Sequence, residues 1–155
     1  MVNQKFYSIV CYLLLSILLI SCSQKLNPNS AFGYKDLTDS YDSKTSLFTR
    51  DYGDDIVKVK ITLRQDEKEK IIKTFSENRF QNLPSEIDCS RWGFHPQIYD
   101  ELFLDNYSVK YIHNSEDRWL CPSGKRFDKI HTVMRDIILN KPEIKKLEPS
   151  DIAYE

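Results

Sequence analysis

The chain has 155 residues, of which 41% are hydrophobic and 29% are charged, a balance typical of one small globular domain. Its 22 basic and 23 acidic residues give a net charge of −1, which excludes the strongly basic surface that nucleic-acid binding requires. Only four glycines are present, which excludes a fibrous or low-complexity chain.

The chain begins with an apolar leader. Residues 6–20 carry no charge, and their number suits a signal peptide but is short for a membrane span, which needs about 20 residues. The leader ends in Leu19-Ile20-Ser21-Cys22, which resembles a bacterial lipobox. The resemblance implies a signal peptide over residues 1–21, cleavage before Cys22, and lipidation of Cys22 by acyl chains such as palmitate. An uncleaved anchor and a cleaved protein without lipid are the alternatives.

The lipobox also implies a location. Two or more acyl chains hold a protein stably on a membrane, so we expect the membrane as a partner and an extracytoplasmic domain. Ser23, where inner-membrane lipoproteins carry aspartate, implies the outer membrane of a two-membrane bacterium, on its periplasmic or surface side. With the lipobox, the Lys/Ile/Asn-rich composition and the closing run at 141–147 resemble small lipoproteins of Bacteroidetes-type bacteria. This resemblance implies no catalytic residues.

A polar stretch follows the lipobox. Residues 22–44 contain the turn-rich segment 27–30 and no apolar period, so they predict a flexible, lipidated tether. Asp36, Asp39 and Asp42 recur within it at a spacing of three. A calcium loop of the EF-hand type needs acids at alternate positions, a central glycine and a terminal glutamate. We therefore interpret the three aspartates as solvated linker residues.

A single domain is predicted over residues 45–155. Strands are expected at 46–51 and 56–64, on either side of the turn residues 52–55. The second strand alternates apolar with polar residues, which predicts a sheet with one face in water. Its apolar residues are Val57, Val59, Ile61 and Leu63.

A helix and then a hairpin are expected next. Asp66 and Glu69 have the spacing of a capping box, so we predict a helix over 66–78. Strands at 98–104 and 107–113 flank a two-residue turn and form a hairpin. In that register apolar residues face each other and opposite charges pair. The expected core face consists of Ile98, Leu102, Leu104, Tyr107, Val109 and Tyr111.

A second helix is predicted from residue 124 or 125 to 140, with Ser123 as its cap and Lys141-Pro142 after its end. Its apolar stripe has helical spacing. The predicted order is strand, strand, helix, strand, strand, helix. The expected fold class is α+β, with an antiparallel sheet of about four strands and two helices on one face.

Two cysteines remain in the expected mature domain. Extending the hairpin outward brings Cys89 and Cys121 close together, which predicts a disulfide in an extracytoplasmic protein. Two reduced thiols are one alternative. A zinc site is the other, since Cys89, His95, His113 and Cys121 are suitable ligand types. Their spacings differ from those of zinc-binding folds, so no metal or other cofactor is expected.

Few groups suggest catalysis. The sequence contains no nucleophile elbow, glycine-rich phosphate loop or HExxH motif. We interpret His95, His113 and His131 as surface or structural residues, and the acidic pairs 54–55 and 116–117 as turn residues. A possible binding surface lies beside the hairpin, although the same side chains could instead cover the sheet next to the disulfide. Its residues are Trp92, Phe94, His95 and Trp119.

These features predict a membrane-anchored, non-catalytic binding or interaction module of the cell envelope, with an envelope protein as a possible partner. One alternative is an envelope inhibitor or immunity-type protein that occupies an enzyme. The other is a small hydrolase that uses one of the three histidines.

Overall fold

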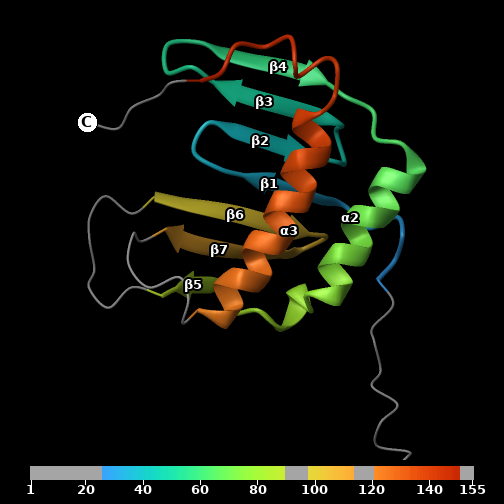
Figure 1. Cartoon of the computed structure of the whole chain (residues 1–155), viewed down its shortest axis with the longest axis vertical. Helices are drawn as coiled ribbons and strands as arrows, with labels where there is room; N and C mark the ends of the chain where they lie inside the picture. Colours follow the sequence, from blue (N-terminus) through green and yellow to red (C-terminus); the bar gives the residue numbers. More distant parts are fainter. Residues whose placement is uncertain (1–25, 90–97, 114–120, 151–155) are drawn as a thin grey trace, which may run out of the picture.

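The computed structural model describes residues 26–89, 98–113 and 121–150. This part of the chain forms one sheet and a layer of helices (Figure 1). The strands are β1 (Phe32–Lys35), β2 (Asp39–Asp42), β3 (Leu47–Asp51), β4 (Ile56–Lys60), β5 (Glu86–Asp88), β6 (Ile98–Leu104) and β7 (Tyr107–His113). The helices are α2 (Gln65–Glu77), α3 (Pro122–Leu139) and the 3-10 turn η1 (Phe80–Asn82).

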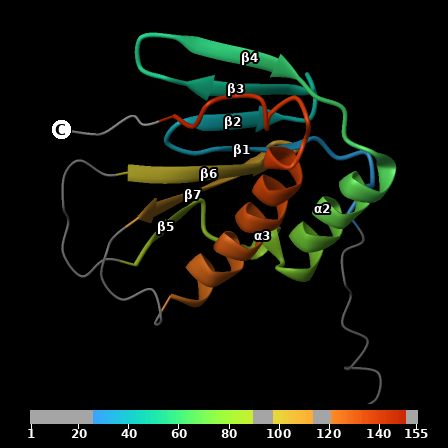
Figure 2. The ribbon, with the colours of Figure 1, turned by 45° about the horizontal axis from the view of Figure 1, so that its top comes forward.

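The sheet has seven strands in the order β4-β3-β2-β1-β6-β7-β5. Its neighbouring strands are antiparallel except for β5, which runs parallel to β7. Both α2 and α3 lie on the same face of the sheet (Figures 1 and 2). The α+β class with two helices is therefore confirmed, whereas an antiparallel sheet of about four strands understates a larger, mixed sheet.

Two of the additional strands lie where a flexible tether was expected. β1 is in the middle of the sheet, between β2 and β6, so the tether interpretation is wrong for residues 32–42. Phe32, Tyr34 and Tyr41 are each at most 2% exposed and supply the apolar side of these strands. Each strand has only four residues, and β2 has a single aromatic residue among aspartates and serine, so the period-2 pattern is too short to recognise.

The hairpin has the predicted register. Leu102 faces Val109, and Glu101 faces Lys110. The core face is correct for Leu102, Leu104, Val109 and Tyr111, which are buried, whereas Tyr107 is half-buried. It is wrong for Ile98, which is 37% exposed because it is the first residue of β6, at the rim of the sheet.

The helix starts differ from prediction. α2 is capped at Arg64, whose N–H donates to Glu67 Oε2 at 2.7 Å, so the capping box lies two residues before the expected one. α3 starts at Pro122, and its cap is Cys121 rather than Ser123. The Cys121 sulfur accepts the Gly124 N–H at 3.2 Å. Neither described helix combines the length and apolar character that crossing a membrane requires.

The predicted disulfide is confirmed. Cys89 and Cys121 are bonded, with their Cα atoms 5.9 Å apart. The bond ties the chain just after β5 to the start of α3. Because the two sulfurs are bonded to each other, they cannot both serve as thiolate ligands in the alternative zinc site. His95 and the side chain of His113 lie outside the described residues.

Candidate functional site

Most of the site residues expected from the sequence fall outside the described part of the chain. These are Cys22, Trp92, Phe94, His95 and Trp119, together with the acidic pair 116–117. Asp54 and Asp55 are described and exposed, in the turn between β3 and β4. The structure instead brings together another set of charged side chains.

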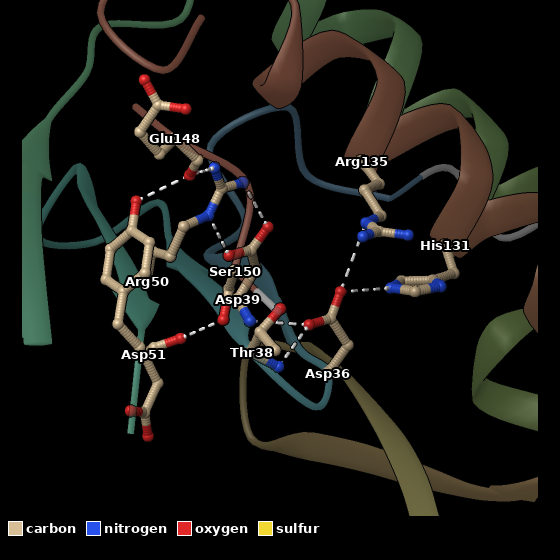
Figure 3. Close-up of polar contacts among 10 residues, drawn as sticks. Asp36, Thr38, Asp39, Arg50, Asp51, His131, Arg135, Glu148 and Ser150 are labelled. Atoms are coloured by element: carbon tan, nitrogen blue, oxygen red, sulfur yellow. Dashed lines mark hydrogen bonds and ion pairs between the residues drawn. The ribbon is translucent and has the colours of Figure 1, made fainter. Parts of the chain in front are cut away.

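An ionic cluster lies between the sheet and α3 (Figure 3). It takes residues from the β1–β2 turn, from the start of β2, from β3, from β6 and from two successive turns of α3. Its members are Asp36, Asp39, Arg50, Asp100, His131 and Arg135. The solvated-linker interpretation is wrong for Asp36 and Asp39, because both point into this layer. Asp42 is also part of the sheet, as the last residue of β2, and its Oδ1 accepts the Lys44 N–H at 2.8 Å in the next turn.

Asp36 closes the turn between β1 and β2. Its Oδ1 accepts the N–H groups of Thr38 at 3.1 Å and Asp39 at 2.7 Å. Its own N–H donates to the Asp39 carbonyl at 2.8 Å. One carboxylate oxygen therefore holds the turn, which is the usual role of aspartate at such a position. The other oxygen, Oδ2, is directed toward α3 (Figure 3).

Asp39 and Arg50 form a two-pronged ion pair across β2 and β3. The Arg50 Nε and one terminal nitrogen each donate to a different Asp39 oxygen at 2.7 Å. Asp39 is 2% exposed and Arg50 is 8% exposed. The other terminal nitrogen of Arg50 donates to the Glu148 carbonyl at 3.0 Å, and Tyr52 donates to the same oxygen at 2.7 Å. The pair therefore also fastens the C-terminal segment to the sheet.

His131 lies between two carboxylates. Its Nε2 is 3.8 Å from Asp36 Oδ2, and its Nδ1 is 3.5 Å from Asp100 Oδ2. The Arg135 Nε, one turn later on α3, is 3.3 Å from Asp36 Oδ2. Burial raises the pKa of Asp36, an effect that the Asp39 N–H and the Arg135 guanidinium oppose. Two carboxylates therefore flank the imidazole, and the Arg135 guanidinium lies beside one of them.

Tyr34 lies beneath this cluster. Its ring meets the His131 ring edge-on, with 5.4 Å between the centroids. Burial, and then the charges of Asp36 and Asp39, raise the pKa of Tyr34. Within the described residues, its buried hydroxyl has no hydrogen-bond partner. A buried hydroxyl of this kind lowers stability, because it loses water and gains no replacement bond.

The sequence offered only part of this site. The aspartate spacing was visible, but Tyr34, Arg50, Asp100 and Arg135 were missed. Arg50 could have been found, because it stands two residues after Phe48 and so shares a side of the expected strand at 46–51 with it. A charge at such a position needs a buried partner. Among residues 26–89, 98–113 and 121–150, no group of three or more His, Cys, Asp or Glu side chains has the arrangement of a metal site.

Chemically, the cluster links the β1–β2 turn, the sheet, α3 and the C-terminal segment through charge-assisted contacts. Comparison with protein-family models, with curated proteins and with solved structures gives no match, so the site is interpreted from this chain alone.

Proposed function

We propose that this protein is a lipid-anchored protein of the bacterial cell envelope whose domain is a non-catalytic interaction module. Residues 1–21 act as the signal peptide, and Cys22 carries the lipid that attaches the protein to the outer membrane. The domain presents its surface to an envelope protein partner outside the cytoplasm.

The ionic cluster is the observation that carries the non-catalytic part of this proposal. Asp39 and Arg50 neutralise each other in the core, and Asp36 is occupied by two backbone N–H groups. Side chains that hold a turn and a helix in place are poorly available to a substrate. The Cys89–Cys121 bond supports the location, because disulfides persist in oxidising compartments outside the cytoplasm.

The anchor is tested by metabolic labelling with an alkyne analogue of palmitate in a two-membrane host that expresses the full chain. Wild-type protein is expected to carry the label and to fractionate with the outer membrane. Cys22→Ser is expected to lose both properties. Cys11→Ser is the matched control, because Cys11 leaves with the signal peptide, and it is expected to keep both. Label on the Cys22→Ser protein would refute the anchor.

The interaction role is tested by chemical cross-linking of the full chain in intact envelopes, followed by mass spectrometry. A defined envelope protein is expected to be recovered with the wild type, and a double Trp92→Ala, Trp119→Ala variant tests the proposed aromatic surface. If the recovered partner is an enzyme that the domain inhibits, the inhibitor form of the proposal is the correct one. Repeated absence of any cross-linked partner would contradict the interaction role.

A histidine-dependent hydrolase is the second candidate, because His131 lies between Asp36 and Asp100. An imidazole oriented by a carboxylate is the usual general base of hydrolases. In a screen with ester, amide and phosphoester substrates, the interaction role predicts no turnover above background. Activity that is present in the wild type and lost in a folded His131→Asn variant would favour the hydrolase instead.

A further inference from the structure

Strand β4 is one of the two edge strands of the described sheet, and it has a neighbour on one side only (Figure 1). In the described part of the chain it pairs with β3 alone. The Ile61 N–H donates to the Ser46 carbonyl, and the Tyr52 N–H donates to the Asp55 carbonyl, both at 2.9 Å. In an antiparallel ladder such bonded positions alternate. Residues 57 and 59 therefore bond to β3, and residues 56, 58 and 60 direct their N–H and C=O groups outward.

The same three residues have side chains on the sheet face away from the helices. Lys58 pairs with Thr49 on that face, whereas Val57 and Val59 pair with the buried Arg50 and Phe48 on the helix side. Ile56 is 55% exposed, and Lys58 and Lys60 are also exposed. Val57 and Val59 are only half-buried, so their apolar surface remains partly uncovered. An added strand would meet cations on one face and aliphatic groups on the other.

The lysines disfavour a second copy of this chain as the added strand. Centred antiparallel pairing of two β4 strands places Lys58 opposite Lys58 of the copy, and like charges in that position are destabilising. Lysines on edge strands commonly prevent such self-association. Neither Lys58 nor Lys60 forms an ion pair within the described residues. Their charges are therefore available to acidic side chains of another protein.

We propose that β4 is the docking edge for an extended segment of a partner protein in which acidic and apolar residues alternate. The segment adds an eighth strand beside β4, and its backbone bonds to residues 56, 58 and 60. Its carboxylates face Lys58 and Lys60, and its apolar side chains cover Val57 and Val59. This inference rests on the proposed interaction role and names the chemistry of the partner.

The test uses the full chain with its anchor in detergent and the peptide Val-Glu-Val-Glu-Val-Glu-Val, which carries fluorescein on its N-terminus and an amide at its C-terminus. The matched control peptide has lysine in place of each glutamate. Fluorescence anisotropy is expected to show binding of the glutamate peptide at least about tenfold tighter than the lysine peptide. The preference is expected to fall as salt is raised. Amide exchange is expected to slow at residues 56, 58 and 60.

Two variants separate charge from backbone pairing. Lys58→Glu with Lys60→Glu is expected to reverse the peptide preference, because the exposed charges change sign while the fold keeps its contacts. Lys58→Pro removes an outward N–H that an edge strand can lose and is expected to weaken both peptides. Lys58→Ala is its control, because it removes the same charge and keeps the N–H, and it is expected to retain partial binding.

Several results would overturn this inference. They are equal binding of both peptides to the wild type, an unchanged preference in the double glutamate variant, and slowed exchange elsewhere but not at β4. Absence of binding at millimolar peptide would also overturn it. The cross-linking experiment distinguishes failure of the β4 docking proposal from failure of the interaction role as a whole. A partner recovered equally by wild type and by the double glutamate variant would leave that role intact and remove β4 as its edge.

Discussion

At the scale of single residues, the least expected feature is that two aspartates from a polar stretch are structural. Asp39 is almost fully buried and binds Arg50 through both oxygens. Removing one partner of a buried ion pair leaves a charge without compensation, which typically costs about 3–5 kcal/mol. This loss of stability is expected even though a buried ion pair stabilises a protein little more than well-packed apolar side chains in the same place would.

Asp39→Asn is therefore expected to lower the free energy of unfolding by about 3 kcal/mol or more in urea titrations. The matched control is Asp42→Asn, three residues further along β2, where the carboxylate accepts a backbone N–H in a surface turn. That variant is expected to lose about 1 kcal/mol or less. Equal small losses in the two variants would show that Asp39 is not a buried ionic partner.

Two tyrosine hydroxyls are expected to behave in opposite ways. Tyr34→Phe is expected to leave stability unchanged or raise it by about 1 kcal/mol, because its buried hydroxyl lacks a partner within the described residues. Tyr107→Phe is expected to lower stability by about 1 kcal/mol, because the Tyr107 hydroxyl donates to the Leu83 carbonyl. Thermal and urea unfolding measure both. A loss in Tyr34→Phe as large as that in Tyr107→Phe would contradict this difference.

At the scale of elements, an ion pair joins the start of α2 to the chain after α3. Lys141 donates to Glu67 Oε2 at 2.5 Å, and both side chains are largely buried. Burial pushes the pKa of Glu67 upward. The Lys141 hydrogen bond, the Arg64 N–H and the two cations outweigh that effect, so the pKa of Glu67 is lowered. A lowered carboxyl pKa means that the ionised form stabilises the folded state.

Glu67→Gln is accordingly expected to cost about 1–2 kcal/mol at neutral pH. The difference from the wild type is expected to shrink as pH falls below the ordinary value of 4.5, and to vanish once Glu67 is protonated in the folded protein. Urea titrations from pH 7 to pH 3 measure this. Glu69→Gln, at an exposed position of the same helix, is the control and is expected to stay within about 0.5 kcal/mol of the wild type. A loss for Glu67→Gln that persists at pH 3 would contradict the ionic contribution.

The disulfide connects elements that are 32 residues apart in sequence. Constraining the unfolded chain over a loop of this size contributes about 3–4 kcal/mol in the chain-entropy model. A Cys89→Ser, Cys121→Ser double variant is expected to lose about that much in urea titrations. Reduction of the wild type with a dithiol is expected to give the same loss, whereas the double variant is expected to be insensitive to reductant. Unchanged stability after verified reduction would show that the bond contributes little.

At the scale of the whole molecule, the sequence predicted what depends on local periodicity. Both helices and the β6–β7 hairpin were predicted from repeating patterns of apolar residues. The disulfide was predicted from the geometry of the hairpin. β1 and β2 do not, because a four-residue strand is stabilised mainly by its neighbours. β1 pairs with β6, about 70 residues later, and no local pattern encodes that pairing. The ionic cluster was missed for the same reason, since Asp39 and Arg50 become partners only after β2 and β3 align.

The architecture separates two roles within one small domain. The helix side of the sheet holds the aromatic core and the ionic cluster, which together fix the strands. The opposite face and the β4 edge carry exposed lysines, including Lys35, Lys58 and Lys60. The proposed interaction role therefore relies on the surface of the domain and leaves its interior unchanged.

The most direct test of the proposed envelope lipoprotein is the intact mass of the full chain purified from the membranes of its host. The predicted mass is that of a polypeptide beginning at Cys22, increased by a diacylglyceryl group and an amide-linked acyl chain. The mass should be lower by two hydrogens for the Cys89–Cys121 bond, with no free thiol after alkylation. A chain that retains residues 1–21, or one cleaved elsewhere and free of lipid, would contradict the proposal.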